Sequence, residues 1–369
     1  MDHVIEINDV DQLRPLRGVW NRLLLETGQA SFFQSLPWLE AYWRRYGRGQ
    51  RLRVLVVGDR EPVGILPLTV IRERTRAGWI RTLTYPLHDW GTRFGPIGPD
   101  PAATLAAGLK HLQRTRQDWD MLDLRWISAG AQLLSATVHA MRSAGFNAST
   151  GVWARTALVD LQGDWESYFA SRTGKFRNNV RRQEQKLARL GDVTYLRYRP
   201  GGAAEGDGQP WLHLYNRCVE LARRSWQGNS TTGTTLSHEA VADFLRQTHI
   251  LAAQAGAADI NLLEVNGTPA AFAYNYCWNG YVFGLRAGYD PVFAQAGAGT
   301  VLIAHMLRDS FERKDHTFDL GTGYLEGKRH WLTRIADCCR ATHYPVSKPR
   351  VQLLRVKHWL KQSVGAAAS

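Results

Sequence analysis

The chain has 369 residues, which is enough for two domains that each bury a core of their own. Charged residues make up only 21% of it, and 14 Trp, 13 Tyr and 12 Phe can fill large cores, which excludes a disordered chain. The net charge of +13 favours acidic partners, such as phosphate-bearing small molecules, nucleic acid or anionic lipid, without choosing among them.

The first third of the sequence predicts helices followed by strands. Residues 11–46 have the pattern of helices interrupted around 28–37. Apolar runs at 52–57 and 63–71 flank the turn-forming residues 58–62, which predicts a hairpin, and 80–85 is a third strand candidate. A helix at 102–116 and a strand at 121–126 complete this half.

A basic helical segment at 164–190 connects the two halves, with its apolar stripe formed by Phe176, Val180, Leu187 and Leu190. It is either the solvated face of a packed helix or a docking surface for an acidic partner. The positive charges lie at Arg172, Lys175, Arg177, Arg181, Arg182, Lys186 and Arg189.

The second half repeats the order of elements in the first. Strands are predicted at 260–265, 269–278 and 281–287, joined by two Asn-Gly turns, and are followed by a helix at 300–313 and a strand at 317–320. The repeat lies in the pattern and hardly in residue identity. We therefore expect two related domains, at 1–155 and 156–346, followed by a basic amphipathic helix and tail at 347–369.

The loop before the helix at 300–313 can bind an oxyanion. Gly297 and Gly299 leave backbone N–H groups uncovered at the start of an apolar helix, where a phosphate is favoured by those donors and by the helix dipole. The corresponding loop of the first half, 95–101, contains three prolines, which have no N–H to donate. We expect phosphate binding in the second half alone.

Location and metal content are predicted from what the sequence lacks. The N-terminus has neither the basic start nor the apolar core of a signal peptide, no apolar run approaches the length of a membrane span, and the cysteines lack Cys-x-x-Cys spacing. We expect a cytoplasmic protein. The tail could contact an anionic membrane surface or pack on the body, through Val351, Leu354, Trp359 and Leu360. His330, Cys338, Cys339 and His343 fit no zinc pattern, so no metal is expected.

Four short motifs together resemble the GNAT superfamily, and within it the CelD-like branch, which is related to Fem-type transferases. The resemblance implies an α/β (α+β) chain of tandem GNAT-like domains, each with a mixed, largely antiparallel sheet flanked by helices. The motifs are Phe33-Gln-Ser-Leu-Pro-Trp38, Arg224-Ser-Trp-Gln227, Tyr289-Asp290, and Phe318-Asp319 followed by Lys328 and Trp331.

The implied activity is N-acyl transfer, from acyl-CoA or an acyl carrier protein to a primary amine of a sugar, peptide or small metabolite. The donor is expected on a splayed strand pair, 281–287 with 317–320, and on the glycine loop. The donor-binding residues implied are Phe283, Leu285, Gln295, Ala296, Gly297, Ala298, Gly299 and Thr300. Ala294 departs from the family loop, which has Arg or Gln at that position.

Catalysis needs a proton for the leaving thiolate and a group that accepts the proton of the amine. We expect Tyr324 to be the acid, and Asp319 or Glu326 to be the base, unless Asp319 orients a backbone turn. The family pattern has Tyr-Lys where this chain has Gly327-Lys328. The acceptor side is expected at Arg224, Trp226, Lys328 and Trp331, although a buried anchor explains Trp226 equally well.

Two other functions remain open at this stage. A Fem-like aminoacyl-tRNA transferase is favoured by the basic helix, but aminoacyl-tRNA offers no pyrophosphate to the glycine loop. A catalytically silent GNAT-fold binding partner in a polysaccharide or natural-product pathway is consistent with Ala294 and Gly327.

Overall fold

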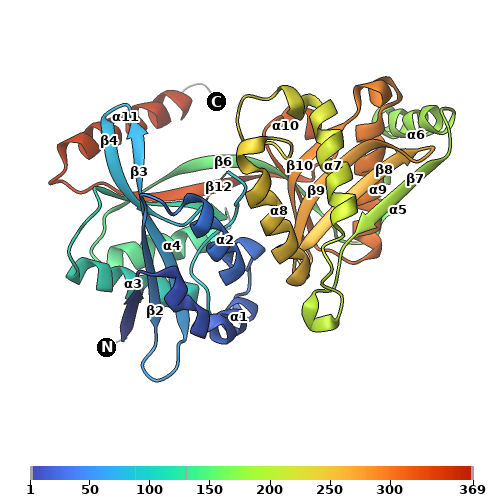
Figure 1. Ribbon diagram of the computed structural model, residues 1–369. Helices are drawn as coiled ribbons and strands as arrows, with labels where there is room; N and C mark the ends of the chain where they lie inside the picture. The colour runs from blue at the N-terminus through green and yellow to red at the C-terminus, as the bar shows by residue number, and fades with distance from the viewer. Residues whose placement is uncertain (1–2, 88, 129–130, 367–369) are drawn as a thin grey trace. The chain divides into compact units, whose positions relative to one another are not determined.

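The computed structural model describes residues 3–87, 89–128 and 131–366 (Figure 1). The chain forms two compact units, Met1–Arg155 with Asp337–Ser369, and Thr156–Ala336. The sequence predicted the divisions 1–155, 156–346 and 347–369. In the structure Asp337–Ser369 belongs to the first unit, because the strand Arg334–His343 pairs with Met121–Ser128.

The sheet of the first unit has the strand order β1-β2-β3-β4-β5-β12. Its neighbours run antiparallel except β4 and β5, which are parallel. The strands are β1 (Val4–Ile7), β2 (Arg51–Val57), β3 (Gly64–Thr75), β4 (Gly78–Thr84), β5 (Met121–Ser128) and β12 (Arg334–His343). The main helices are α1 (Arg17–Glu26), α2 (Leu36–Tyr46), α3 (Pro101–Arg114), α4 (Ala131–Ser143) and α11 (Pro349–Ala366).

The sheet of the second unit has the order β6-β11-β10-β9-β8-β7, with β10 and β11 parallel and the other pairs antiparallel. Its strands are β6 (Ala148–Asp160), β7 (Val193–Tyr198), β8 (Ala258–Val265), β9 (Thr268–Trp278), β10 (Tyr281–Tyr289) and β11 (Thr317–Thr322). Its helices are α5 (Trp165–Ala170), α6 (Gly174–Ala188), α7 (Leu212–Arg224), α8 (Glu239–Gln254), α9 (Ala298–Glu312) and the short α10 (Leu325–Lys328).

Two tight turns fix the register of β8, β9 and β10. Asn266 and Gly267 have φ of 50° and 73°, and Asn279 and Gly280 have φ of 46° and 71°. Two successive residues with positive φ define the type I′ turn, whose twist matches that of an antiparallel hairpin, and Asn-Gly is the dipeptide that adopts it most readily. The predicted hairpins are therefore confirmed.

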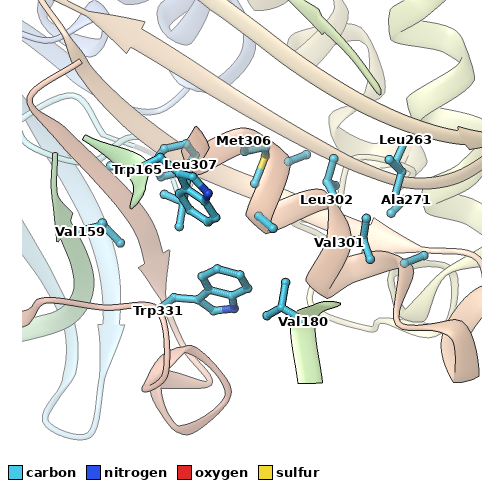
Figure 2. Packing of buried hydrophobic residues seen from close by; sticks show 14 of the residues in the cluster. Val159, Trp165, Val180, Leu263, Ala271, Val301, Leu302, Met306, Leu307 and Trp331 are labelled. Carbon is cyan, nitrogen blue, oxygen red and sulfur yellow. The ribbon is translucent and has the colours of Figure 1, made fainter. Parts of the chain in front are cut away.

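The core around the candidate site forms where α5, α6 and α9 pack on the sheet of the second unit. Figure 2 shows Val301, Leu302, Met306 and Leu307 of α9 in this core, with Val180 of α6 and Trp331 nearby. Because Ala298, Val301 and Leu302 at the start of α9 are buried, packing of this helix fixes the position of the glycine loop.

The structure confirms the predicted fold class, a mixed α/β chain with mostly antiparallel sheets flanked by helices. In Figure 1 α11 lies beside β4, and its Val351 and Leu354 are buried against Ile80, Met121 and Tyr344, which is packing on the body. The side chains of Trp359 and Leu360 lie outside those described. Within the described residues, no helix combines the length and the apolar character needed to cross a bilayer.

Candidate functional site

β10 and β11 pair at three positions and then separate. Tyr281, Val282 and Phe283 are opposite Thr317, Phe318 and Asp319, whereas β10 continues to Tyr289 and β11 to Thr322. The register of β10 against β9 shifts between Gly284 and Arg286, which is a β-bulge at the point of separation. A bulge bends the strand and interrupts its ladder, so backbone donors and acceptors of β10 beyond it are not used by β11.

Two glycines allow the backbones to approach closely where the strands part. A Cβ atom on Gly284 would lie 2.6 Å from the carbonyl oxygen of Asp319. Gly321 has a φ of +84°, and a Cβ atom there would lie 3.0 Å from the carbonyl oxygen of Gly284. Both positions therefore require glycine, one for space and the other for conformation as well.

Asp319 lies at this point and accepts hydrogen bonds from three directions. Its Oδ1 accepts from the hydroxyl of Thr156 on β6 and, at 2.7 Å, from the backbone N–H of Gly321. Its Oδ2 accepts from the hydroxyl of Tyr281 at 3.3 Å. The bond to the residue two positions ahead is an Asx turn, so Asp319 orients the backbone turn that follows β11.

Lys328 closes the same turn from the other side. Its Nζ donates to the carbonyl oxygens of Gly321, Thr322 and Gly323 at 2.9, 3.1 and 2.9 Å. Burial lowers the pKa of this ammonium to about 8, while the charge of Asp319 acts in the opposite direction. With its donors engaged by the backbone, Lys328 is placed to hold the loop, and an incoming acceptor would have to compete for it.

Tyr324 follows this loop and points outward. It has a φ of 43° and is 82% exposed. A Cβ atom on Gly327 would overlap the Tyr324 ring, so the glycine at 327 leaves room for that ring. Glu326 forms an exposed ion pair with Arg329.

The predicted acceptor residue Trp331 lies in the core and not at the surface. It is only 3% exposed, its ring meets that of Phe176 edge-on at 4.7 Å, and its carbonyl accepts from the Tyr168 hydroxyl. The structure therefore brings Asp319, Lys328 and the Tyr324 loop together, and gives Trp331 the surroundings of an anchor.

The glycine loop begins with a short 3₁₀ helix, Pro291–Ala296, whose first turn is capped by Asp290. Gly297 then adopts a left-handed conformation, with φ of 78° and ψ of 31°, and α9 starts at the next residue. In the described part of the chain, the N–H groups of Ala298 and Gly299 donate to no protein acceptor. Thr300 donates its N–H to the carbonyl of Gly297 at 2.9 Å.

The side chains of the other predicted donor-binding residues differ in how far they are exposed to solvent. Gln295 is exposed and Leu285 is half-buried at the bulge. Ala296, Ala298 and Phe283 are buried, so the two alanines present only backbone and Phe283 packs on the ring of Tyr281 at 4.4 Å.

Arg224 and Trp226 lie at the far end of β10. The Trp226 indole donates to the carbonyl oxygen of Ala287 at 3.0 Å, and Arg224 forms an ion pair with Asp290 at 3.0 Å. Gln227 donates to the same carbonyl of Ala287 at 3.2 Å. The segment after α7 thus holds the end of β10 and the start of the glycine loop, while Trp226 stays 57% exposed.

Four residues around the site had no role assigned from the sequence: Thr156, Tyr281, Gln183, and Gln227, which stood only as the last residue of the motif at 224–227. Tyr281 could have been suspected, because it lies on β10 two residues before Phe283, which is opposite Asp319 on β11. The other three come from elements remote in sequence. Within the described residues, no group of three or more His, Cys, Asp or Glu could hold a metal ion.

The segment that carries the site is similar to one family of known domains. Residues 174–329 match the model of a family described as acetyltransferase (GNAT) domain. The matched segment lies in the second unit and contains the glycine loop, β10, β11 and Lys328. The match does not distinguish the CelD-like branch, which stays a prediction. A search of curated proteins found no match.

Solved structures with the same fold include FemX, with a TM-score of 0.61 and 11% sequence identity, over 95% of this chain and 99% of that chain. A conserved protein of unknown function from Bacteroides thetaiotaomicron VPI-5482 has a TM-score of 0.55 and 12% identity, over 93% and 100% of the two chains. The C-terminal domain (DUF2156) of a putative lysylphosphatidylglycerol synthetase from Agrobacterium fabrum has a TM-score of 0.54 and 13% identity, over 95% and 96%. At these identities the similarity concerns the fold.

Proposed function

We propose that the chain is an N-acyltransferase that moves an acyl group from a coenzyme A thioester to a primary amine of a sugar, peptide or small metabolite. The observation that carries the proposal is the separation of β10 from β11 beside the N-terminus of α9, within the segment that matches the GNAT family. The GNAT fold provides the donor site in this way, by a strand edge and a helix N-terminus.

Each part of the donor has a matching part of the chain. The pyrophosphate is an anion, and the N–H groups of Ala298 and Gly299 together with the α9 dipole favour an anion. The pantetheine arm carries amides, which can pair with the backbone of β10 beyond Phe283. The thioester then reaches the bulge at Gly284 to Arg286, where backbone N–H groups can polarise its carbonyl.

In the reaction the neutral amine nitrogen attacks the thioester carbonyl carbon and forms a tetrahedral oxyanion. The C–S bond then breaks, the nitrogen loses a proton to water, and the thiolate gains one from a protein group. Because the thioester is already activated, correct positioning supplies much of the acceleration. We assign Asp319 and Lys328 to the loop that sets this position, and Tyr324, carried by that loop, to protonation of the thiolate.

Binding of the donor is tested by thermal shift with coenzyme A, acetyl-CoA and a long-chain acyl-CoA. We expect stabilisation by at least one of them, and loss of that stabilisation in Gly297→Pro, because proline cannot adopt a φ of 78°. Gly206→Pro is the matched control, since Gly206 is also a left-handed glycine that ends a 3₁₀ helix, with φ of 75°. A wild-type protein that none of the three compounds stabilises would eliminate a coenzyme A donor.

The acceptor is tested by mass spectrometry of amino sugars, peptides and small amines incubated with the donor that binds. The expected product gains the mass of one acyl group at a primary amine. An acyl group found only on hydroxyl groups would contradict transfer to nitrogen.

A further inference from the structure

Helix α6 and its C-cap residue, Arg189, carry four exposed positive charges on one side. Lys175, Arg182, Lys186 and Arg189 are separated by seven, four and three residues, which places them within roughly 60° of one another around the helix axis. They extend along about 21 Å, at 1.5 Å of rise per residue. We call these four residues the basic stripe. The opposite side packs into the core through Phe176, Val180 and Leu187.

The charges of the basic stripe are not neutralised by the protein. In the described part of the chain, none of the four has a carboxylate within ion-pair distance, and Arg182 alone among them donates to a side chain, that of Asn179 at 2.9 Å. Other arginines of the same unit are paired, including Arg197 with Asp259 and Arg217 with Glu264. Like charges three or four residues apart destabilise a helix, so the stripe has a cost that an anionic partner would remove.

The basic stripe lies beside the part of α6 that touches the glycine loop. Gln183 touches this loop, because a Cβ atom on Gly297 would lie 2.7 Å from its Oε1. Around the helix axis Gln183 lies between the buried side and Lys186. Glu184, which approaches Arg308 of α9 at 4.0 Å, lies on the other flank. The stripe is therefore next to the place where the phosphates of the donor are proposed to bind.

The length of the stripe indicates the kind of partner. A free coenzyme A thioester gathers its phosphates near one point, at the glycine loop, whereas four charges in line match an extended acidic surface. Single-stranded nucleic acid is bound through aromatic stacking as well as charge, and the one aromatic residue of α6, Phe176, is buried in the core.

We propose that the basic stripe docks an acidic carrier protein that presents the acyl group on a phosphopantetheine arm. This inference rests on the proposed function, since the arm enters the same site between β10 and β11. The thioester chemistry is unchanged: the amine gains the acyl group, and the thiol stays on the carrier protein. Coenzyme A and the carrier protein share the site for the arm, and only the carrier protein needs the stripe.

The test compares two variants that each lose four positive charges. In the stripe variant, Lys175, Arg182, Lys186 and Arg189 become Gln; in the control, the exposed residues Arg48, Arg60, Arg76 and Arg116 of the first unit become Gln. Affinities are measured at 50 mM salt for three probes, an acylated acyl carrier protein, coenzyme A and a bulk tRNA. All substituted side chains are exposed, and unchanged coenzyme A binding shows that the site is folded.

We expect the stripe variant to bind the carrier protein roughly 30-fold more weakly than wild type, as is typical when four rim charges are removed, and to keep its affinity for coenzyme A within about twofold. The control should lose at most about threefold. Equal losses in both variants, or none in either, would overturn the proposal, as would tighter stripe-dependent binding of tRNA than of the carrier protein. Carrier binding through the stripe without coenzyme A binding would support the stripe and refute the coenzyme A donor.

Discussion

The packing of Gln183 against Gly297 predicts a measurable coupling between α6 and the glycine loop. Gly297→Ala keeps the N–H but must hold an L side chain in the left-handed region, which costs about 1–2 kcal/mol. Its Cβ would also overlap the Gln183 side chain, and overpacking of this kind costs about 1–3 kcal/mol. We therefore expect Gly297→Ala to lower the free energy of unfolding by about 2–5 kcal/mol, and Gln183→Ala to cost less.

In the double variant the overlap is absent and only the backbone strain remains. The second substitution should then recover about 1–3 kcal/mol, so that the two single effects are not additive. Urea-induced unfolding of the four proteins gives this coupling energy, and the affinity for coenzyme A measured in parallel shows whether the same contact positions the donor loop. Additive effects within about 0.5 kcal/mol would mean that α6 does not pack against the loop in solution.

Four further predictions concern single residues. Trp331→Ala should destabilise the protein by about 3–5 kcal/mol in urea unfolding, because the ring is buried in the core; a loss below about 1 kcal/mol would contradict that role. Tyr324→Phe should lower kcat more than donor affinity. Gly327→Ala should have the same effect, because its Cβ would displace the Tyr324 ring. An unchanged kcat in both variants would contradict a catalytic role of Tyr324. Burial lowers the pKa of the Lys328 ammonium to about 8, so its hydrogen bonds to the loop carbonyls should weaken as the pH rises through 8. The kcat of the wild type should therefore fall in this range, whereas Lys328→Met should show no such step. Burial lowers the pKa of His249 from 6.5 to about 4, so between these pH values the unfolded chain binds a proton that the folded chain does not. The contribution of this residue to the free energy of unfolding is complete above pH 6.5 and should be lower by about 2 kcal/mol at pH 5. His249→Gln should abolish this difference.

The features that the sequence predicted well are set by local chemistry. Asn279 and Gly280 form a type I′ turn because few other dipeptides tolerate two positive φ angles in succession. The helix predicted at 300–313 is α9, and the residue before it is Gly297, whose left-handed conformation glycine adopts without steric cost. Neither the turn nor the start of the helix depends on distant parts of the chain, so a few neighbouring residues were sufficient to predict them.

The features that the sequence did not predict depend on contacts between distant residues. Asp319 accepts from Thr156, which is 163 positions away, and nothing near either residue indicates the pair. Trp331 looked like an acceptor residue by its place in a motif, but its burial is decided by Phe176 and Tyr168 from other helices. The sequence near Asp337–Ser369 also did not indicate that this segment belongs to the first unit, because it joins that unit through the pairing of β12 with β5.

The geometry around Gly327 bears on the departure from the family pattern. The resemblance implies a tyrosine side chain at position 327, directly before Lys328, whereas this chain has the tyrosine three residues earlier. Its ring covers the space that a side chain on residue 327 would need, and the loop between Asp319 and Tyr324 is held by Asp319 at one end and by Lys328 across its carbonyls. In this chain the place of the Tyr324 ring and the glycine at 327 therefore depend on each other. We expect Gly327→Tyr, which fills the place of the Tyr324 ring, to lower kcat as Tyr324→Phe does, and an unchanged kcat would contradict catalysis by Tyr324 from its present position.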